Sequence, residues 1–161
     1  MNSHPMRRSR QEITDPADLE EILSSAPVCR IGFAAEGEPY VVPMNFGWAR
    51  EEGTLAVYLH CAGDGRKLPL LRSGSRVCFQ TELAGELRPA EEPCDWGIRF
   101  RSLVGWGVPR ELSGPEEKTR GLNRIMEKYS GRTFVFDEAQ LARTRIFRIP
   151  LTEVTAKRSS V

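Results

Sequence analysis

The sequence predicts a mainly β fold in which antiparallel strands form a Greek-key-like barrel with helices at its periphery. Several segments alternate apolar and polar residues with a period of two, which is typical of half-buried strands. Short turns rich in glycine, proline and acidic residues join these segments. Strands and long helices do not alternate regularly along the chain, so a barrel is favoured over a doubly wound parallel sheet.

The first expected elements are a helix and three strands. Thr14 or Asp15 can cap a helix that has Pro16 at its first position and ends at Pro27. Proline has no N–H for a strand ladder, so Pro43 indicates an edge, a bulge or a backbone that faces a ligand. The strands are expected from Val28 to about residue 35, over Tyr40–Trp48 and over Thr54–His60, joined by turns at 36–39 and 50–53.

The second half of the chain continues the barrel. Gly105 and Gly107 lie inside a long strand, where glycines usually mark the sharp coil of a barrel corner. The elements expected in order are a small-residue loop at 61–65, a short helix at 66–72, strands at 75–83 and 98–112, a helix that starts with a capping box at 113–116, and a closing strand at 144–149.

Length and charge limit the possible functions. The 161 residues suit one domain, and 23 basic residues nearly balance 22 acidic ones. Global charge therefore favours neither nucleic acid nor an anionic membrane as a partner. No apolar run approaches the roughly 20 residues that span a bilayer, and no signal-peptide core follows the basic start. We expect a cytoplasmic protein with a flexible tail over 1–12 and a single domain over 13–161.

The cysteines and histidines indicate neither a disulfide framework nor a metal centre. The four cysteines are widely spaced and form no CxxC pair, so they are interpreted as buried apolar side chains or free thiols. The two histidines are His4, in the expected tail, and His60. This is too sparse a ligand set for a structural zinc site.

The segment most suggestive of chemistry runs from Tyr58 to Lys67. A strand ends there, a glycine-containing loop lets the backbone approach a ligand, and Arg66 and Lys67 stand where a helix begins. Backbone amides, a helix dipole and two cations together suit a phosphate monoester. An ordinary surface turn with two solvated cations fits the same pattern.

Two further segments carry polar groups beside apolar ones. The break in the strand at Pro43 would leave backbone N–H and C=O groups free to hydrogen-bond the polar edge of a planar ring, and the Asn45 side chain adds a donor and an acceptor. The alternative is a core strand with a proline defect. Arg99 and Arg101 share one face of a strand, which indicates an anionic partner, buried carboxylates or simple solvent exposure. Trp96 precedes that strand and could cover a substrate ring.

In this order, these segments resemble the flavoproteins related to pyridoxamine 5'-phosphate oxidase, and within them the nitroimidazole-reductase (Nim-type) branch. The resemblance extends over almost the whole chain, and its specificity comes from several runs in register. The runs that carry it are Tyr40–Trp48, Val57–His60, Gly65–Lys67, Arg76–Phe79 and Arg99–Gly107.

The resemblance implies a split β-barrel homodimer that binds FMN at the subunit interface. It implies a phosphate clasp at Arg66 and Lys67, an isoalloxazine-lining strand at Pro43, Met44, Asn45 and Phe46, a cofactor contact at Arg101 and Ser102, and an active-site histidine at His60. One departure is that pyridoxamine phosphate oxidases carry a basic residue near the end of the second strand, where this chain has Asn45-Phe46-Gly47. Their C-terminal Trp and Arg substrate elements also have no clear counterpart, which argues against pyridoxamine phosphate as the substrate.

The leading hypothesis is an FMN-dependent oxidoreductase that reduces a small planar substrate, with nitroaromatic compounds as one class. His60 shares a strand face with Ala56 and Tyr58, opposite Leu55 and the other apolar residues, so we expect its ring to face a ligand and to donate a proton. A neutral hydrogen-bonding histidine at a strand end is equally consistent with the pattern. A non-catalytic flavin carrier, a haem protein that uses His60, and a deazaflavin in place of FMN all remain open.

Overall fold

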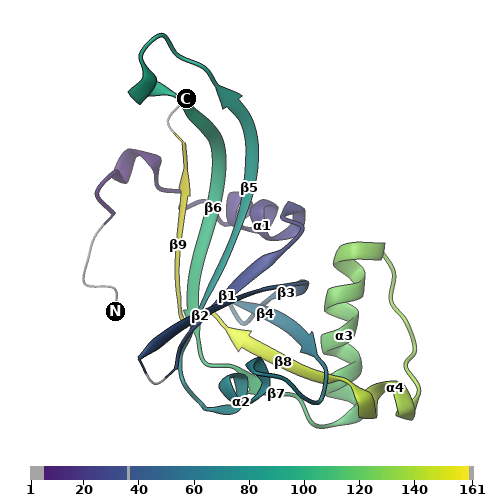
Figure 1. The fold of residues 1–161 in the computed structure, drawn as a ribbon. Coiled ribbons are helices and arrows are strands. Elements are labelled where there is room, and N and C mark those ends of the chain that lie inside the picture. Colours follow the sequence, from purple (N-terminus) through teal and green to yellow (C-terminus); the bar gives the residue numbers. More distant parts are fainter. Residues whose placement is uncertain (1–5, 36, 160–161) are drawn as a thin grey trace.

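The computed structural model describes residues 6–35 and 37–159. Two antiparallel sheets pack around one apolar core, with helices at the periphery (Figure 1). The first sheet contains, in spatial order, β2 (Glu38–Met44), β1 (Cys29–Ala35), β5 (Val77–Arg88), β6 (Gly97–Gly107) and β9 (Glu153–Arg158). The second contains β3 (Phe46–Glu51), β4 (Thr54–Cys61), β8 (Arg145–Pro150) and β7 (Arg110–Glu111). The prediction of a mainly β fold with peripheral helices is confirmed.

The helices lie where capping signals place them, with one correction. Asp15 caps α1 (Pro16–Ser25) by accepting from the backbone N–H of Ala17 at 2.8 Å. The short helix α2 covers Lys67–Arg72. Helix α3 (Pro115–Ser130) has Gly114 at its N-cap without a side-chain cap, so the capping box expected at 113–116 was wrong.

The predicted strand over Tyr40–Trp48 is two strands that belong to different sheets. Strand β2 ends at Met44 and β3 begins at Phe46, so the chain crosses between the sheets at Asn45. Pro43 lies in β2 at the edge of the five-stranded sheet, a position where proline is tolerated in sheets. Of the three alternatives for Pro43, the edge was therefore right, and the prediction of a single strand over Tyr40–Trp48, interrupted at Pro43, was wrong.

Two elements near the C-terminus were not predicted. Helix α4 (Glu138–Arg143) starts at a capping box in which Asp137 and Gln140 exchange side-chain and backbone hydrogen bonds. Strand β9 follows β8 and pairs with β6, so the last strand of the fold lies in the five-stranded sheet rather than at 144–149.

Helix α3 covers the outer face of the four-stranded sheet, which corrects the expected orientation of β4. Ala56 and Tyr58 are buried in a second apolar cluster beneath α3, with Ile125 and Ile146. The close approach depends on Gly121, because a Cβ there would lie 2.9 Å from the Ile146 side chain. Only His60, at the end of this face, is exposed.

The five-stranded sheet has one face in the core and one without a helix on it. Ile31, Phe79 and Leu103 point into the core, and α1 contributes Ile22 and Leu23 on the same side. The opposite side is called the open face below. By strand alternation and register, it carries Val41, Pro43, Arg30, Gly32, Cys78, Gln80, Glu82, Ser102, Val104, Trp106, Thr155 and Lys157.

Strands β5, β6 and β9 extend beyond the barrel as a long arm (Figure 1). The arm narrows to the β5–β6 connection, and the register shifts between Ala84 and Leu87. The N-terminal segment runs beside β9, where Glu12 bridges to Lys157. Residues 1–5 of the predicted tail, including His4, lie outside the described residues. No helix among the described residues is long and apolar enough to cross a membrane.

Candidate functional site

The glycine loop after β4 brings several cations together. Gly65 has a φ of 99°, a left-handed conformation that favours glycine, and it leads directly into α2. The Arg66 guanidinium turns toward β2, where it pairs with Glu38 at 3.2 Å and lies 4.6 Å from the centre of the Tyr40 ring. Lys67 lies close enough to His60 to influence its protonation. The two clasp residues therefore flank the loop on different sides.

The Arg145 side chain places an unpaired hydrogen-bond donor beside this loop. Its Nε is buried without a hydrogen-bond acceptor among the described residues. A Cβ at Gly63 would lie 3.8 Å from the same atom. Buried donors in native structures nearly always have a partner, so this unpaired nitrogen marks Arg145 as a cation that no carboxylate engages at its Nε, beside a glycine loop. The residues present thus fit a phosphate group at this loop.

Nearby charges keep that donor from being neutralised internally. Glu111 is held by Arg72 through two hydrogen bonds of 2.6 and 2.8 Å. Lys118 is buried and donates to the Leu141 carbonyl. Desolvation, and then the neighbouring Arg145, lower the pKa of Lys118. Glu111 is therefore already engaged by Arg72, and it makes no hydrogen bond to the Arg145 Nε.

His60 and Asn45 lie at the same end of the β3–β4 hairpin. The pairing of these strands runs up to Phe46 opposite Leu59, and Asn45 and His60 are the next residues on each side. Partial desolvation and the nearby Lys67 lower the pKa of His60 from its usual value. The imidazole is therefore mainly neutral at neutral pH, able to donate from one nitrogen and to accept at the other.

The predicted ring-lining segment presents only some of its residues outward. Pro43 and Asn45 are exposed, whereas Met44 and Phe46 are buried. The Met44 carbonyl accepts from the Cys29 thiol at 3.3 Å, and the Phe46 N–H donates to the Tyr129 hydroxyl at 3.2 Å. The backbone groups of these two buried residues already have partners, so Pro43 and Asn45 are the residues free to meet a ligand.

Arg101, Ser102 and Trp96 are separated from the histidine. Arg101 lies on the α1 side of β6, where it donates to both carboxylate oxygens of Glu21 at 2.7 Å. Ser102 lies on the open face instead, because neighbouring residues of a strand point to opposite sides. Trp96 stands at the arm and is 51% exposed. His60 thus lies near Asn45 and Lys67, and Arg66 contacts β2, the strand that also carries Pro43.

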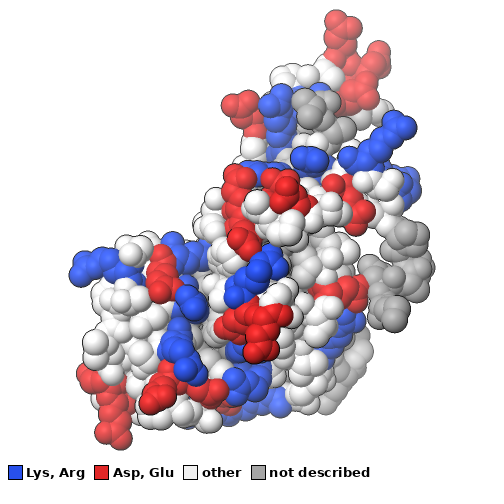
Figure 2. All heavy atoms as spheres, turned by 180° about the vertical axis from the view of Figure 1, so that it is seen from behind, with Lys and Arg blue, Asp and Glu red and all other residues white. Residues whose placement is uncertain are grey.

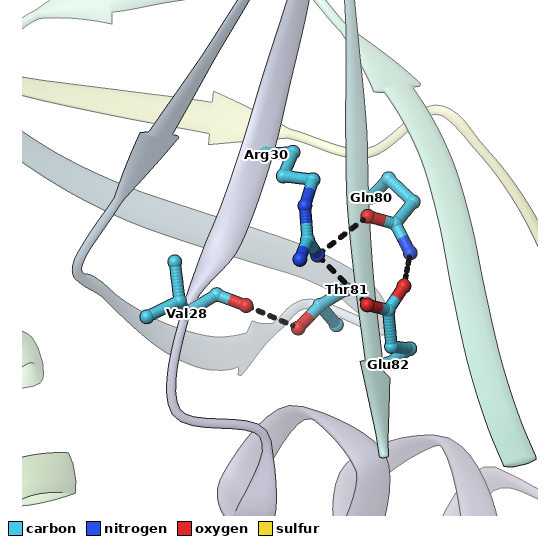
Figure 3. Close-up of polar contacts among 5 residues, drawn as sticks. All are labelled: Val28, Arg30, Gln80, Thr81 and Glu82. Carbon is cyan, nitrogen blue, oxygen red and sulfur yellow. Dashed lines mark hydrogen bonds and ion pairs between the residues drawn. The ribbon is translucent and has the colours of Figure 1, made fainter. Parts of the chain in front are cut away.

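Sequence reasoning missed a polar network on the open face. Arg30 of β1 donates to the side chains of Gln80 at 3.2 Å and Glu82 at 3.0 Å on β5, and Gln80 also donates to Glu82 (Figure 3). Thr81 points to the other side and donates to the Val28 carbonyl at 2.9 Å. Polar residues recurring at every second position of β5 were the signal, because they are typical of a face outside the core.

The described ranges 6–35 and 37–159 contain no group of three or more His, Cys, Asp or Glu side chains arranged to hold a metal ion.

A family model for pyridoxamine 5'-phosphate oxidase matches residues 15–158. The chain belongs to this family. A candidate 5-nitroimidazole antibiotic resistance protein from Bacteroides thetaiotaomicron is 29% identical, with a TM-score of 0.79 over 91% of this chain and 86% of that one. This similarity confirms the expected relationship to the nitroimidazole-reductase branch, and with it the split β-barrel fold. No curated protein matched the sequence.

Two more distant structures share the fold. The flavocytochrome Anf3 from Azotobacter vinelandii has a TM-score of 0.81 at 21% identity, over 99% of this chain and 74% of that one. An FAD and haem binding protein from Mycobacterium smegmatis has a TM-score of 0.82 at 16% identity, over 94% of this chain and 74% of that one. At these identities the comparison shows a common architecture alone.

Proposed function

We propose that this protein is an FMN-dependent oxidoreductase that reduces a small planar substrate, with nitroaromatic compounds as the leading class. The observation that carries the proposal is the unengaged Arg145 donor at the glycine loop, within the same region as Lys67 and His60. The family supports a flavin, and the 29% identical protein is named for nitroimidazole resistance.

Different residues of the chain would bind the phosphate and the ring of FMN. Lys67 and Arg145 would hold the FMN phosphate, and Arg66 would join them by exchanging its exposed pairing with Glu38 for the phosphate. Pro43 and Asn45 would border the ring, and Met44 and Phe46 would hold that strand in the core. FMN, when bound, supplies the redox chemistry, and the protein supplies orientation and electrostatics. The resemblance also implies contacts from Ser102 and Arg101 of the long strand, but both terminal nitrogens of Arg101 are already engaged by Glu21.

The spectrum of the purified protein tests the cofactor, and a pair of variants tests the clasp. We expect flavin absorption, with FMN identified by mass after release. A charge-assisted phosphate contact contributes about 1.5–3 kcal/mol, so Lys67→Ala/Arg66→Ala should weaken FMN by about tenfold or more. Arg50→Ala/Arg124→Ala, which removes two ion-paired arginines elsewhere, is the matched control. Unchanged affinity in the folded clasp variant would refute the assignment.

His60 is proposed to donate a proton to the reduced substrate. Its lowered pKa predicts that the rate falls as pH rises through a value below the ordinary histidine range, because the protonated form is then lost. His60→Ala should slow flavin reoxidation by a nitroaromatic acceptor by about 10²–10⁴-fold in stopped flow, at equal flavin loading. Equal rates would remove His60 from the mechanism, and a joint loss of loading and turnover would show that it orders the loop.

A second candidate is a flavin or haem carrier without turnover. The specific observation in its favour is that His60 is exposed and mainly neutral, which is the form of histidine that ligates iron. Two structures of the same architecture are named for haem. A Soret band in the purified protein that disappears in His60→Ala would support this candidate over the reductase.

The open face is proposed as the surface on which a second copy binds, so that the protein is a homodimer. Val41 is 59% exposed there, next to Gly32 and the half-buried Cys78, Val104 and Trp106. The open face combines these apolar residues with the Arg30 network, and we propose it as a permanent interface, a class that commonly buries about 2,000 Å² or more. Sedimentation should give a dimer, and a flavin-loaded monomer at micromolar concentration would refute it.

A further inference from the structure

The N-terminal segment forms a basic turn beside the end of β9. Residues Ser9–Gln11 form a 3-10 turn, in which the Gln11 N–H donates to the Arg8 carbonyl at 2.9 Å. The Ile13 N–H then donates to the Ala156 carbonyl of β9, also at 2.9 Å. These contacts place Arg7, Arg8 and Arg10 beside Arg158 at the end of the same strand.

These four arginines line a cavity that contains no carboxylate. It has a volume of about 480 Å³, and its remaining lining comes from Ser9, Gln11 and Ser159. Elsewhere among the described residues nine ion pairs neutralise arginines. None of those pairs involves Arg7, Arg8, Arg10 or Arg158. Four guanidinium groups that form no ion pair with a described carboxylate repel one another, and a multivalent anion would relieve that repulsion.

A second cavity adjoins the first and adds aromatic surface. It has a volume of about 360 Å³ and shares Arg8, Gln11 and Ser159 with the arginine-lined cavity. Its other wall is formed by the arm, including Trp96 and Phe100. The Lys157 ammonium lies 5.8 Å from the centre of the Phe100 ring, which adds a further cation at this junction. The two cavities together therefore present guanidinium groups at one end, and the exposed Trp96 ring and the partly buried Phe100 ring at the other.

The acidic residues around this cleft favour a small ligand over a long polyanion. Asp95 lines the second cavity, and Glu86, Glu91 and Glu92 are exposed on the arm beyond it. Figure 2 shows acidic residues at the top of the arm and basic residues gathered beneath them. A nucleic-acid strand that continued past the arginines would meet these carboxylates and be repelled.

We propose that this cleft binds a nucleotide, with its phosphates on Arg7, Arg8, Arg10 and Arg158 and its base stacked on Trp96. Guanidinium groups bind phosphates through paired hydrogen bonds, and an exposed indole is a good surface for any base. The two cavities are of a size typical of small-molecule sites. This site is separate from the glycine loop and does not depend on the proposed flavin chemistry.

Calorimetric titration of the purified, full-length protein with ADP tests the proposal. We expect ADP to bind and adenosine to bind much more weakly. Arg8→Ala/Arg158→Ala should weaken ADP by about tenfold or more, because two charge-assisted contacts are lost. The matched control is Arg120→Ala/Arg143→Ala, which removes two exposed arginines from α3 and α4 and should leave ADP binding unchanged.

The base contact is tested separately with Trp96→Leu. This change should weaken ADP by about fivefold or more and leave inorganic pyrophosphate unaffected, because only the nucleotide stacks. Absence of ADP binding at millimolar concentration would overturn the proposal, as would equal binding of ADP and pyrophosphate. Tighter binding of a single-stranded oligonucleotide than of ADP would show a nucleic-acid surface instead. Flavin absorption of each variant should match the wild type, which separates this result from a failure at the glycine loop.

Discussion

The two sheets differ in how completely they are covered. The four-stranded sheet has the main core on one face and α3 on the other, so Val57 and Tyr58, adjacent in β4, are both buried. The five-stranded sheet has the core on one face only. Its other face carries the Arg30 network and Val41, with no helix packed upon it in the described part of the chain (Figure 1).

This difference separates residues that hold the fold from residues that can meet a partner. Where both faces are covered, close packing leaves no room for added atoms, and backbones approach at glycines. Where one face is open, side chains can change without disturbing the core. The candidate flavin site lies at Asn45, where the chain passes from the open sheet to the covered one, and so has a rigid support beside an accessible surface.

The largest expected effect is a loss of stability when a methyl group is added between the four-stranded sheet and α3. A Cβ at Gly47 would lie 2.3 Å from the carbonyl carbon of Arg124 in the α3 backbone, which cannot yield without moving the helix. Gly47→Ala should therefore reduce the free energy of unfolding by about 3 kcal/mol in urea denaturation. Gly97→Ala, in β6 of the other sheet, meets no atom within 4 Å and should change it by less than about 1 kcal/mol. Equal losses would remove the contrast between the sheets.

A smaller effect, on dimer affinity, is expected when a charged residue is introduced on the open face. Val41→Asp places a carboxylate within the proposed interface, on its edge strand β2, and should raise the dimer dissociation constant by about tenfold or more. Val135→Asp is the matched control, because Val135 is 97% exposed on the segment between α3 and α4. Sedimentation at several protein concentrations measures both. If both variants dimerise as the wild type does, the interface lies elsewhere.

Arg101 distinguishes a fold contact from a cofactor contact. Both of its terminal nitrogens are engaged by Glu21, and hydrogen bonding to that carboxylate raises the pKa of Arg101. From this geometry, Arg101→Ala should loosen α1 and leave FMN affinity nearly unchanged. FMN titration of the variant measures this, with Ser102→Ala as the comparison on the open face. A loss of about tenfold in Arg101→Ala would instead support the contact that the family resemblance implies.

The sequence predicted an element correctly where the signal for that element lay in neighbouring residues of the chain. Asp15, Pro16 and the alternation of β4 are local, and α1 and β4 form as predicted. The burial of Tyr58 was missed because it depends on α3, which approaches through Gly121, a residue that looks neutral in a helical pattern. Strand β9 was missed because its alternation is weak, with Ala156 its one fully buried residue.

The candidate site was likewise predicted only where its residues are neighbours in the sequence. The glycine loop and its two cations were visible in sequence, because they are contiguous. Arg145 was not, since β8 reaches the loop only through its pairing with β4, where Cys61 lies opposite Arg145. The capping box at Asp137 and Gln140 was present in the sequence and could have revealed α4.

The smallest expected effect is a difference in thiol reactivity, which tests the open face without altering it. Cys94 is exposed on the arm, whereas burial raises the pKa of Cys29 to about 12 and also raises the pKa of Cys61. Because the thiolate is the reactive form, a thiol reagent at neutral pH should label Cys94 first and leave the two buried thiols until unfolding.

Cys78 is the informative thiol, because it lies on the open face between Gly32 and Trp106 and is only partly buried. Burial raises its pKa, and the nearby Arg76 opposes that rise, so it should react slowly but measurably in a separated protomer. In the proposed dimer a second copy covers it, and its labelling should slow further. Mass spectrometry of labelled wild type and Val41→Asp measures this directly, and faster labelling of Cys78 in the variant is the expected result. If Cys78 in the wild type reacted as fast as Cys94, the open face would be uncovered in solution, and the interface would have to be sought on another surface.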